Sequence, residues 1–323
     1  MGKLGFDAVL IGRNEGARLL QALDRVRAVA RHVVYVDSGS DDGSVQQARA
    51  AGAVVVELDP ARPFTAARAR NEGFAALGAD RSEFVHFIDG DCILAPDWPA
   101  TALAFLDAHP QAALVHGYSY EDAPDASVYN WLTDQEWKKP TGPAASGIGT
   151  FIGRSAAFAA VGGFRDGMIA AEDDELFFRL RNAGWQTWCI DARMCGHDVR
   201  LLQFSAWFRR MIRAGHSFSE LGVLHPGAAR ASRLRAVVWA GGLPVLAVAG
   251  LVVWLPLVAV VCALYALSGA RLWRRCRAQG LPPKRALTAA ALLVLGKFAN
   301  LYGMATYWAR RFRRSDARII EYR

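Results

Sequence analysis

The sequence predicts an α/β protein: a single Rossmann-like domain with a mostly parallel sheet flanked by helices, followed by C-terminal membrane helices. Short β-branched runs alternate with helical patterns between residues 8 and 88, as in parallel α/β folds. No charged residue occurs between residues 236 and 270, which exceeds the roughly 20 apolar residues that one membrane helix needs. The 323 residues, 53% of them hydrophobic, suffice for one or two domains with a large core.

The elements of the sheet domain follow from local patterns. Four apolar runs of strand length are expected as strands, at 8–11, 33–36, 53–58 and 84–88. Helices are expected between them, at 17–30, from about residue 43, and at 64–77. A further helix is expected to begin at the acidic residues 172–175 and to end near Gly184.

Charge is divided unevenly along the chain. The formal net charge is +8, with 38 basic and 30 acidic residues. Residues 231–323 contain 15 Lys/Arg and 2 Asp/Glu, so residues 1–230 retain 23 and 28 and carry a net charge of −5. An acidic N-terminal part followed by a basic, apolar C-terminal part indicates that the chain binds membrane lipids, and it argues against nucleic acid as a partner. We therefore expect a cytoplasmic domain at 1–230 and a membrane-anchoring region at 231–323.

The anchoring region is expected to contain a hairpin at 236–270, a basic loop at 271–285 and a helix at 286–312. Arginines flank the hairpin on both sides, so both of its ends are expected on the cytoplasmic face, with a turn near 254–256. Spanning and re-entrant hairpins are both open, and the last helix is interfacial or spanning because Lys297 interrupts it. The five cysteines form no CxxC pair, and no signal peptide is expected at the N-terminus. These features predict the inner, cytoplasmic membrane.

Polar side chains follow three of the expected strands directly. These are Arg13, Asn14 and Glu15 after the first strand, Asp37 and Ser38 after the second, and Asp89 and Asp91 after the fourth. Ligands of open α/β sheets bind at the carboxyl ends of the strands, so these residues are candidates for one site. Asp89 and Asp91 flank a glycine, where both carboxylates can reach one hard cation. Mg²⁺ or Mn²⁺ is expected there, bridging to a substrate diphosphate.

Two further features are ambiguous by themselves. The acidic residues 172–175 open a helix, where carboxylates either complement the helix dipole or supply a general base. His197 follows a glycine and precedes an aspartate, and either a solvated role or a ligand role fits it. Trp131 and Trp137 fit either the core or an acceptor groove, and the stretch 204–212 fits either a membrane-surface helix or a packed helix.

The order of motifs resembles the family-2 glycosyltransferases with the GT-A fold over roughly residues 5–200. The matching segments are AVLIGRNEGARL, VVYVDSGSDDGS, ARNEGF, HFIDGDC, GGFRDG, AEDDELFFRLRNAGW and GHD, and the tail segments LLVLGKFANLYG and IIEYR are similar to those of membrane-attached members. The resemblance implies that Asn14, Glu15 and Asp37 hold the nucleotide and that Arg70 lies near it. It implies that Asp89 and Asp91 bind the metal and the diphosphate, and that His197 helps to hold the metal or the diphosphate. It also implies Asp173 as catalytic base, with Glu172 beside the acceptor.

The resemblance implies that the chain transfers one sugar, with inversion, from a nucleotide-sugar donor to a lipid-linked or glycan acceptor. Such a reaction belongs to cell-envelope or exopolysaccharide assembly. A QxxRW block, typical of processive polymerases in the family, is missing after Gln203, which favours single-sugar transfer. Two alternatives stay open: a nucleotidyltransferase, and a catalytically inactive membrane scaffold or sugar-nucleotide sensor. The intact acidic motifs disfavour the scaffold. Donor, acceptor and oligomeric state are not specified by the sequence.

Overall fold

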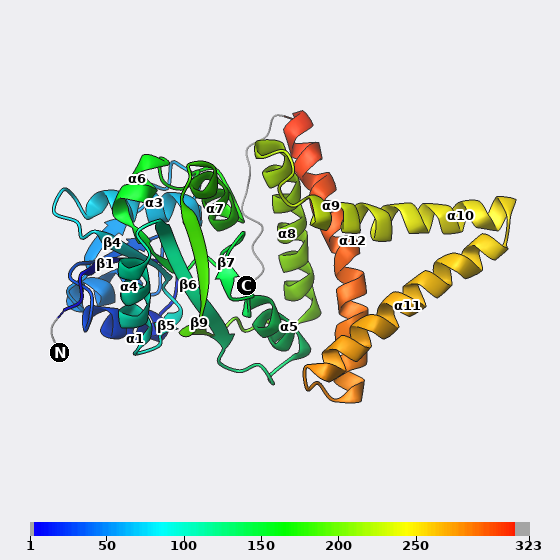
Figure 1. Ribbon diagram of the computed structural model, residues 1–323, viewed down its shortest axis with the longest axis horizontal. Helices are drawn as coiled ribbons and strands as arrows, with labels where there is room; N and C mark the ends of the chain where they lie inside the picture. Colours follow the sequence, from blue (N-terminus) through cyan, green and yellow to red (C-terminus); the bar gives the residue numbers. More distant parts are fainter. Residues whose placement is uncertain (1–2, 314–323) are drawn as a thin grey trace. The chain divides into compact units, whose positions relative to one another are not determined.

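The computed structural model describes residues 3–313, and it divides into two compact units (Figure 1). We call residues 3–123 and 133–199 the N-terminal unit, and residues 124–132 and 200–313 the C-terminal unit. The segment IIEYR and Arg314, both noted in the sequence, lie outside the described residues.

The N-terminal unit is built on one nine-stranded sheet. Its strands are β1 (Phe6–Gly12), β2 (Val33–Asp37), β3 (Val54–Glu57), β4 (Phe84–Asp89), β5 (Cys92–Leu94), β6 (Ala112–Glu121), β7 (Gly142–Pro143), β8 (Phe151–Arg154) and β9 (Gln186–His197). Their order is β3-β2-β1-β4-β8-β6-β9-β5, and β7 also pairs with β9. The expected strands are all present, within one or two residues at each end.

Strand direction is mixed rather than mostly parallel. The first four strands pair in parallel, as expected from their alternation with helices. Strand β8, however, inserts antiparallel between β4 and β6, and β9 pairs antiparallel with β5 and β7. Strand β9 also pairs in parallel with β6. Strand β5 follows β4 without a helix between them, and β8 follows the loop at 144–150, so no βαβ crossover fixes these two strands as parallel. The fold class is thus α/β, with a mixed sheet and flanking helices.

Helices cover both faces of this sheet. They are α1 (Ala17–Arg27), α2 (Ser44–Ala50), α3 (Ala66–Ala76), α4 (Trp98–Ala108), α6 (Ser155–Ala160) and α7 (Glu172–Asn182). Alternate residues of β1 enter two separate cores, because successive strand side chains point to opposite faces. Leu10 packs with Leu19 and Leu23 of α1, whereas Val9 lies in the other core, which includes Phe74 of α3. This packing fixes α3, and therefore Arg70, against the sheet.

The C-terminal unit is helical. It contains part of α5 (Val128–Trp137), then α8 (Phe204–Leu224), α9 (Arg230–Ala236), the π-helix η1 (Val237–Gly242), α10 (Leu243–Val253), α11 (Pro256–Ala278) and α12 (Pro283–Arg313). Helices α10 and α11 are the two arms of a hairpin that turns at residues 254–255, where the sequence predicts it (Figure 1). Within residues 3–313, three segments are long and apolar enough to cross a membrane: Arg230–Val253, Pro256–Ala278 and Pro283–Arg313.

The basic stretch 271–285 differs from the loop expected there. Helix α11 continues to Ala278, α12 begins at Pro283, and only residues 279–282 connect them. Arginine is a good helix former, and the chain leaves the helix at Gly280, whose φ of +92° suits a residue without Cβ.

Helices α8 and α12 pack closely against each other within the C-terminal unit. A Cβ atom added to Gly303 of α12 would lie 2.0 Å from the carbonyl oxygen of Ile212 in α8, so only glycine fits this crossing. Trp207 is buried, which confirms the packed-helix alternative for that part of 204–212. Trp131 is also buried, beside Cys276 and Leu281, which confirms its core alternative.

Candidate active site

The carboxyl ends of three parallel strands bring the predicted polar residues to one edge of the sheet. Gly12 of β1 pairs with Asp37 of β2, and Ile11 of β1 pairs with Asp89 of β4. Strands β1, β2 and β4 therefore end at the same level, so the polar residues that follow them face one region. The candidate site is built on this edge.

The loop after β2 is shaped by the buried carboxylate of Asp37. This carboxylate accepts hydrogen bonds from the backbone N–H groups of Gly39 (2.9 Å) and Ser40 (2.8 Å), and from the hydroxyls of Ser40 (2.5 Å) and Tyr35 (3.0 Å). Burial and the Asp37 charge raise the pKa of Tyr35 above its ordinary range, so the phenol stays a donor. Asp37 thus orders the turn in which Ser38 lies.

The loop after β1 is tied to the same turn. Asn14 adopts a φ of +57°, its backbone N–H donates to the Ser40 hydroxyl (2.9 Å), and its side-chain oxygen accepts from the Asp41 N–H (2.9 Å). Glu15 accepts from Arg18 (3.3 Å), and Arg13 is exposed beside them. The two loops therefore form one hydrogen-bonded rim.

Arg70 links two acidic motifs that are far apart in the sequence. Its buried guanidinium donates to Asp89 (2.7 Å) and to Glu172 (2.6 Å). Burial lowers the pKa of Arg70, but the charges of Asp89 and Glu172 outweigh this and raise it, so the side chain stays cationic. Gly149 has a φ of +75°, and a Cβ there would lie 2.9 Å from the Arg70 Nη2. The absence of a side chain at Gly149 thus leaves room for the Arg70 guanidinium.

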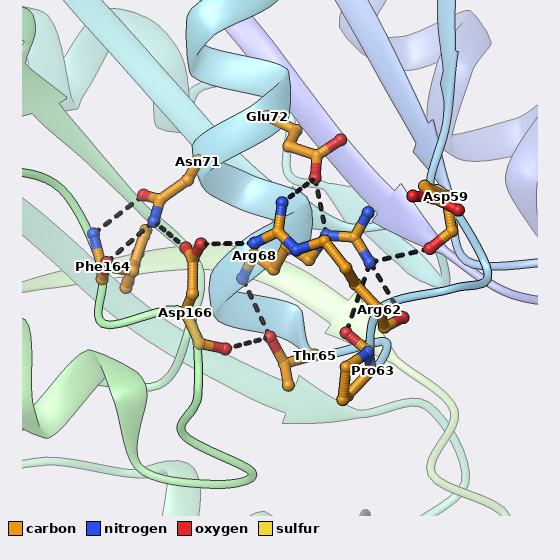
Figure 2. Close-up of polar contacts among 9 residues, drawn as sticks. All are labelled: Asp59, Arg62, Pro63, Thr65, Arg68, Asn71, Glu72, Phe164 and Asp166. Carbon is orange, nitrogen blue, oxygen red and sulfur yellow. Dashed lines mark hydrogen bonds and ion pairs between the residues drawn. The ribbon is translucent and has the colours of Figure 1, made fainter.

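A second polar network holds the loop before α7 against α3 (Figure 2). Asn71 donates to the carbonyl oxygen of Phe164 (2.8 Å) and to the Asp166 carboxylate (2.6 Å), and accepts from the Phe164 N–H (2.8 Å). The Thr65 hydroxyl donates to the Asp166 carbonyl oxygen (2.6 Å). Since Asn71 follows Arg70, this clamp sets the approach of Glu172 to Arg70.

Arginines extend the same network at the start of α3 (Figure 2). Arg68 donates to Glu72 (2.6 Å) and to the carbonyl oxygens of Asp59 and Arg62 (both 3.0 Å), while Arg62 donates to Asp166 (3.2 Å). Arg68 is buried and its hydrogen bonds are charge-assisted, which makes the loop before α3 a rigid support.

Each acidic residue at the start of α7 has a different environment. Glu172 is bound to Arg70, and Asp174 accepts from the Gly147 N–H (3.2 Å). Burial, followed by the charge of Asp173, raises the pKa of Asp174 to about 7. Burial and the charge of Glu172 likewise raise the pKa of Asp173. These acids therefore do more than complement a helix dipole, and Asp173 has the raised basicity that a general base needs.

Asp91 and His197 meet across two antiparallel strands. The His197 Nε2 lies 3.1 Å from the Asp91 Oδ2, and Cys92 of β5 pairs directly with His197 of β9. Among the described residues, Asp91, Cys92 and His197 form a group whose potential ligand atoms all lie within 4.8 Å of one another. Trp137, the second ambiguous tryptophan, packs its ring against His197 at 4.8 Å. Asp89 lies outside this group and contacts Arg70.

The structure therefore brings the predicted residues into two adjoining sets. One joins Asp89, Arg70 and Glu172, with Asp173 next in the chain, and the other joins Asp91 and His197. Two contributors, Asn71 and Cys92, are not predicted from the sequence. Asn71 stands in the motif ARNEGF without an expected role, and Cys92 looks like an ordinary apolar strand residue. Only their pairing with residues 93 or more positions away reveals them.

Comparison with known proteins identifies proteins that are similar to this chain in sequence and in fold. Residues 7–161 match the sequence model of glycosyl transferase family 2. The chain is 36% identical over 121 residues to the O-antigen biosynthesis protein RfbC of Myxococcus xanthus, an alignment covering 36% of this chain but only 9% of that protein. The mannosyltransferase PcManGT from Pyrobaculum calidifontis, solved in complex with GDP-Man and Mn²⁺, has a similar fold. Its TM-score is 0.56 at 19% identity, covering 91% of this chain and 88% of that chain.

Proposed function

From the premise that residues 7–161 form a glycosyl transferase family 2 domain, we propose that the chain transfers one sugar, with inversion, from a nucleotide-sugar to an acceptor hydroxyl. The single observation that carries this proposal is the Arg70 bridge. It joins the strand-end aspartate Asp89 to Glu172 at the acidic start of α7, so a proposed donor-binding motif and the residue next to the candidate base share one ion network.

Asp173 is the proposed base. Its neighbour Glu172 is paired with Arg70, whereas the pKa of Asp173 is raised by burial and by the Glu172 charge. A carboxylate of raised pKa removes the proton from an acceptor hydroxyl as its oxygen attacks the anomeric carbon. One base with direct displacement by that oxygen inverts the anomeric configuration. Glu172 is the proposed contact beside the acceptor.

The strand-end loops are proposed to hold the donor nucleotide. Asp37 orders the turn that contains Ser38, and Asn14 ties this turn to Arg13 and Glu15. Such a rigid rim of polar groups at strand ends is where open α/β sheets bind ligands. The Arg70 cation faces Asp89 at the same edge and supplies positive charge near the diphosphate.

The residues present fit a divalent ion. The buried Asp91 carboxylate faces the His197 imidazole at 3.1 Å, and oxygen and imidazole ligands suit Mn²⁺ or Mg²⁺. Asp91 and His197 would hold the ion, and Asp89 would serve as a further carboxylate ligand. The chemistry that such an ion supplies when bound is neutralisation of charge on the departing nucleoside diphosphate.

The acceptor is proposed to be lipid-linked or a glycan, presented at the cytoplasmic face of the inner membrane. Three segments long and apolar enough to cross a membrane support this location, as does their arginine-rich flanking sequence. In this proposal the hairpin arms α10 and α11 enter the bilayer, and the basic residues 271–278 stay on the cytoplasmic side. The similarity to an O-antigen biosynthesis protein supports a cell-envelope glycan as the product.

The test is release of nucleoside diphosphate by the detergent-purified full chain from a panel of UDP-, GDP- and dTDP-sugars. Each donor is incubated with Mn²⁺, Mg²⁺ or EDTA, with and without a membrane lipid extract as acceptor. We expect release from one donor that requires metal and extract and is lost in Asp173→Asn. A wild-type chain that neither binds nor cleaves any donor in the presence of metal would contradict the proposal.

A further inference from the structure

The candidate metal group contains a thiol that the transfer reaction does not use. Cys92 begins β5 directly after Asp91, pairs with His197 across the sheet, and is buried. Its sulfur, the Asp91 carboxylate oxygen and a His197 ring nitrogen all lie within 4.8 Å of one another. Sulfur, nitrogen and oxygen ligands together favour zinc and other thiophilic ions over the hard ions Mg²⁺ and Mn²⁺.

We propose that Asp91, Cys92 and His197 form a binding site for thiophilic divalent ions, with zinc as the representative, in which the Cys92 thiolate is a direct ligand. The inference deepens the proposed function by adding a second kind of metal to the same site. Zinc binding itself does not depend on the proposed function, whereas inhibition of sugar transfer by zinc rests on it. A zinc ion held by these three groups occupies Asp91 and His197, so it competes with the ion that serves the donor diphosphate.

The Asp91–His197 pair fits this assignment, and the Cys92 sulfur lies within 4.8 Å of both ligand atoms. Zinc bonds of about 2.0–2.3 Å in tetrahedral geometry place neighbouring ligand atoms roughly 3.3–3.6 Å apart. The Asp91 Oδ2 and His197 Nε2 are already 3.1 Å apart, so this pair needs only a few tenths of an ångström of adjustment. Three protein ligands leave the fourth position for water, as in open zinc sites.

The backbone restricts how far the ligands can move apart. Strands β5 and β9 pair through three residues, with Cys92 opposite His197 and Leu94 opposite Cys195. The Trp137 ring packs against His197, and the Cys195 sulfur lies 3.1 Å from the Ser119 hydroxyl. Binding replaces the S–H bond of Cys92 with a sulfur–zinc bond and releases one proton to solvent, so the charge balance requires no further reactant.

The test uses Co²⁺ as a spectroscopic substitute for zinc in the metal-free, detergent-purified full chain, with a non-thiol reductant present. A cobalt–thiolate bond gives a charge-transfer band in the near ultraviolet that carboxylate and imidazole ligands alone do not give. We expect this band in the wild type, saturating at one equivalent, and its displacement by Zn²⁺. We expect Cys92→Ser to lose the band and to bind zinc more than about 100-fold more weakly, since even indirect partners of a metal contribute about 10–100-fold.

Cys189→Ser is the matched control, because Cys189 is equally buried and lies on β9 but belongs to the other core. It should retain the band. His197→Gln keeps the thiol and should weaken cobalt binding while the circular dichroism spectrum stays unchanged, which separates ligand loss from misfolding. A wild type without the band, or a band that persists in Cys92→Ser, would overturn the inference.

Donor cleavage is measured in parallel, so that the two proposals fail separately. Inhibition by Zn²⁺ that excess Mn²⁺ relieves supports the inference together with the proposed function. A cobalt–thiolate band in a chain that cleaves no donor supports the site and contradicts the proposed function. Cleavage without the band supports the function and overturns the site.

Discussion

Replacing Arg70 with methionine tests the ion network at the centre of the site. The substitution keeps the length and apolar stem of the side chain but removes its charge. Arg70 makes two short, charge-assisted hydrogen bonds, to Asp89 (2.7 Å) and Glu172 (2.6 Å), and its side chain is only 2% exposed. Removing one partner of a buried ion pair typically costs about 3–5 kcal/mol, because the remaining charge stays buried without compensation. Here that charge is the Glu172 carboxylate, whose side chain is 10% exposed.

That loss is large compared with the total stability of a domain, about 5–15 kcal/mol. For a unit of this size each kcal/mol lowers the Tm by about 2–4 °C, so we expect a decrease of roughly 6–20 °C in Arg70→Met. Thermal unfolding of the purified chain, followed by circular dichroism, measures this decrease.

Arg49→Met provides the matched control. Arg49 also pairs with a carboxylate, that of Glu57, but both side chains are more than half exposed. An exposed pair contributes about 0–1 kcal/mol, so its removal should lower the Tm by no more than about 4 °C. If Arg70→Met is no less stable than Arg49→Met, the buried bridge does not hold the two motifs together and our reasoning about the site fails.

Two further predictions concern the start of α7 and the clamp before it. Burial raises the pKa of Asp173, and a general base must be ionised to act. We therefore expect kcat/KM to fall as the pH drops through a value above the ordinary aspartate range. A fall in kcat/KM only near the ordinary value, about 4, would contradict this. Asn71→Ala removes three hydrogen bonds to the loop at 164–166, worth about 0.5–1.5 kcal/mol each, so we expect a loss of roughly 2–4 kcal/mol in chemical unfolding. The exposed control Arg25→Ala should leave the stability unchanged.

The sequence predicts the strand ends well because the signals there are local. A short apolar run that stops at Asp37 or Asp89 defines both a strand and the polar group at its carboxyl end, without knowledge of the rest of the chain. The parallel pairing of the first four strands follows from the helices between them. This part of the fold and its candidate ligand-binding edge could therefore be predicted from local sequence patterns alone.

The other half of the site depends on contacts between distant segments. Arg70 and Glu172 are 102 positions apart, and Cys92 meets His197 only because β5 pairs with β9. The antiparallel insertion of β8 between β4 and β6 carries no local signal either. Helix α11 extends through an arginine-rich stretch that composition alone suggested as a loop, because helix propensity and flanking charge are independent properties.

The central claim is that one buried acidic–basic network performs sugar transfer. It is tested most directly by metal-dependent release of nucleoside diphosphate from the sugar-nucleotide panel, comparing the wild type with Asp173→Asn. We expect the wild type to cleave one donor in the presence of acceptor. We expect Asp173→Asn to bind that donor with unchanged affinity in calorimetry but to release almost no product. An Asp173→Asn variant as active as the wild type would contradict the assignment of the base, and a wild type that binds no donor would contradict the claim itself.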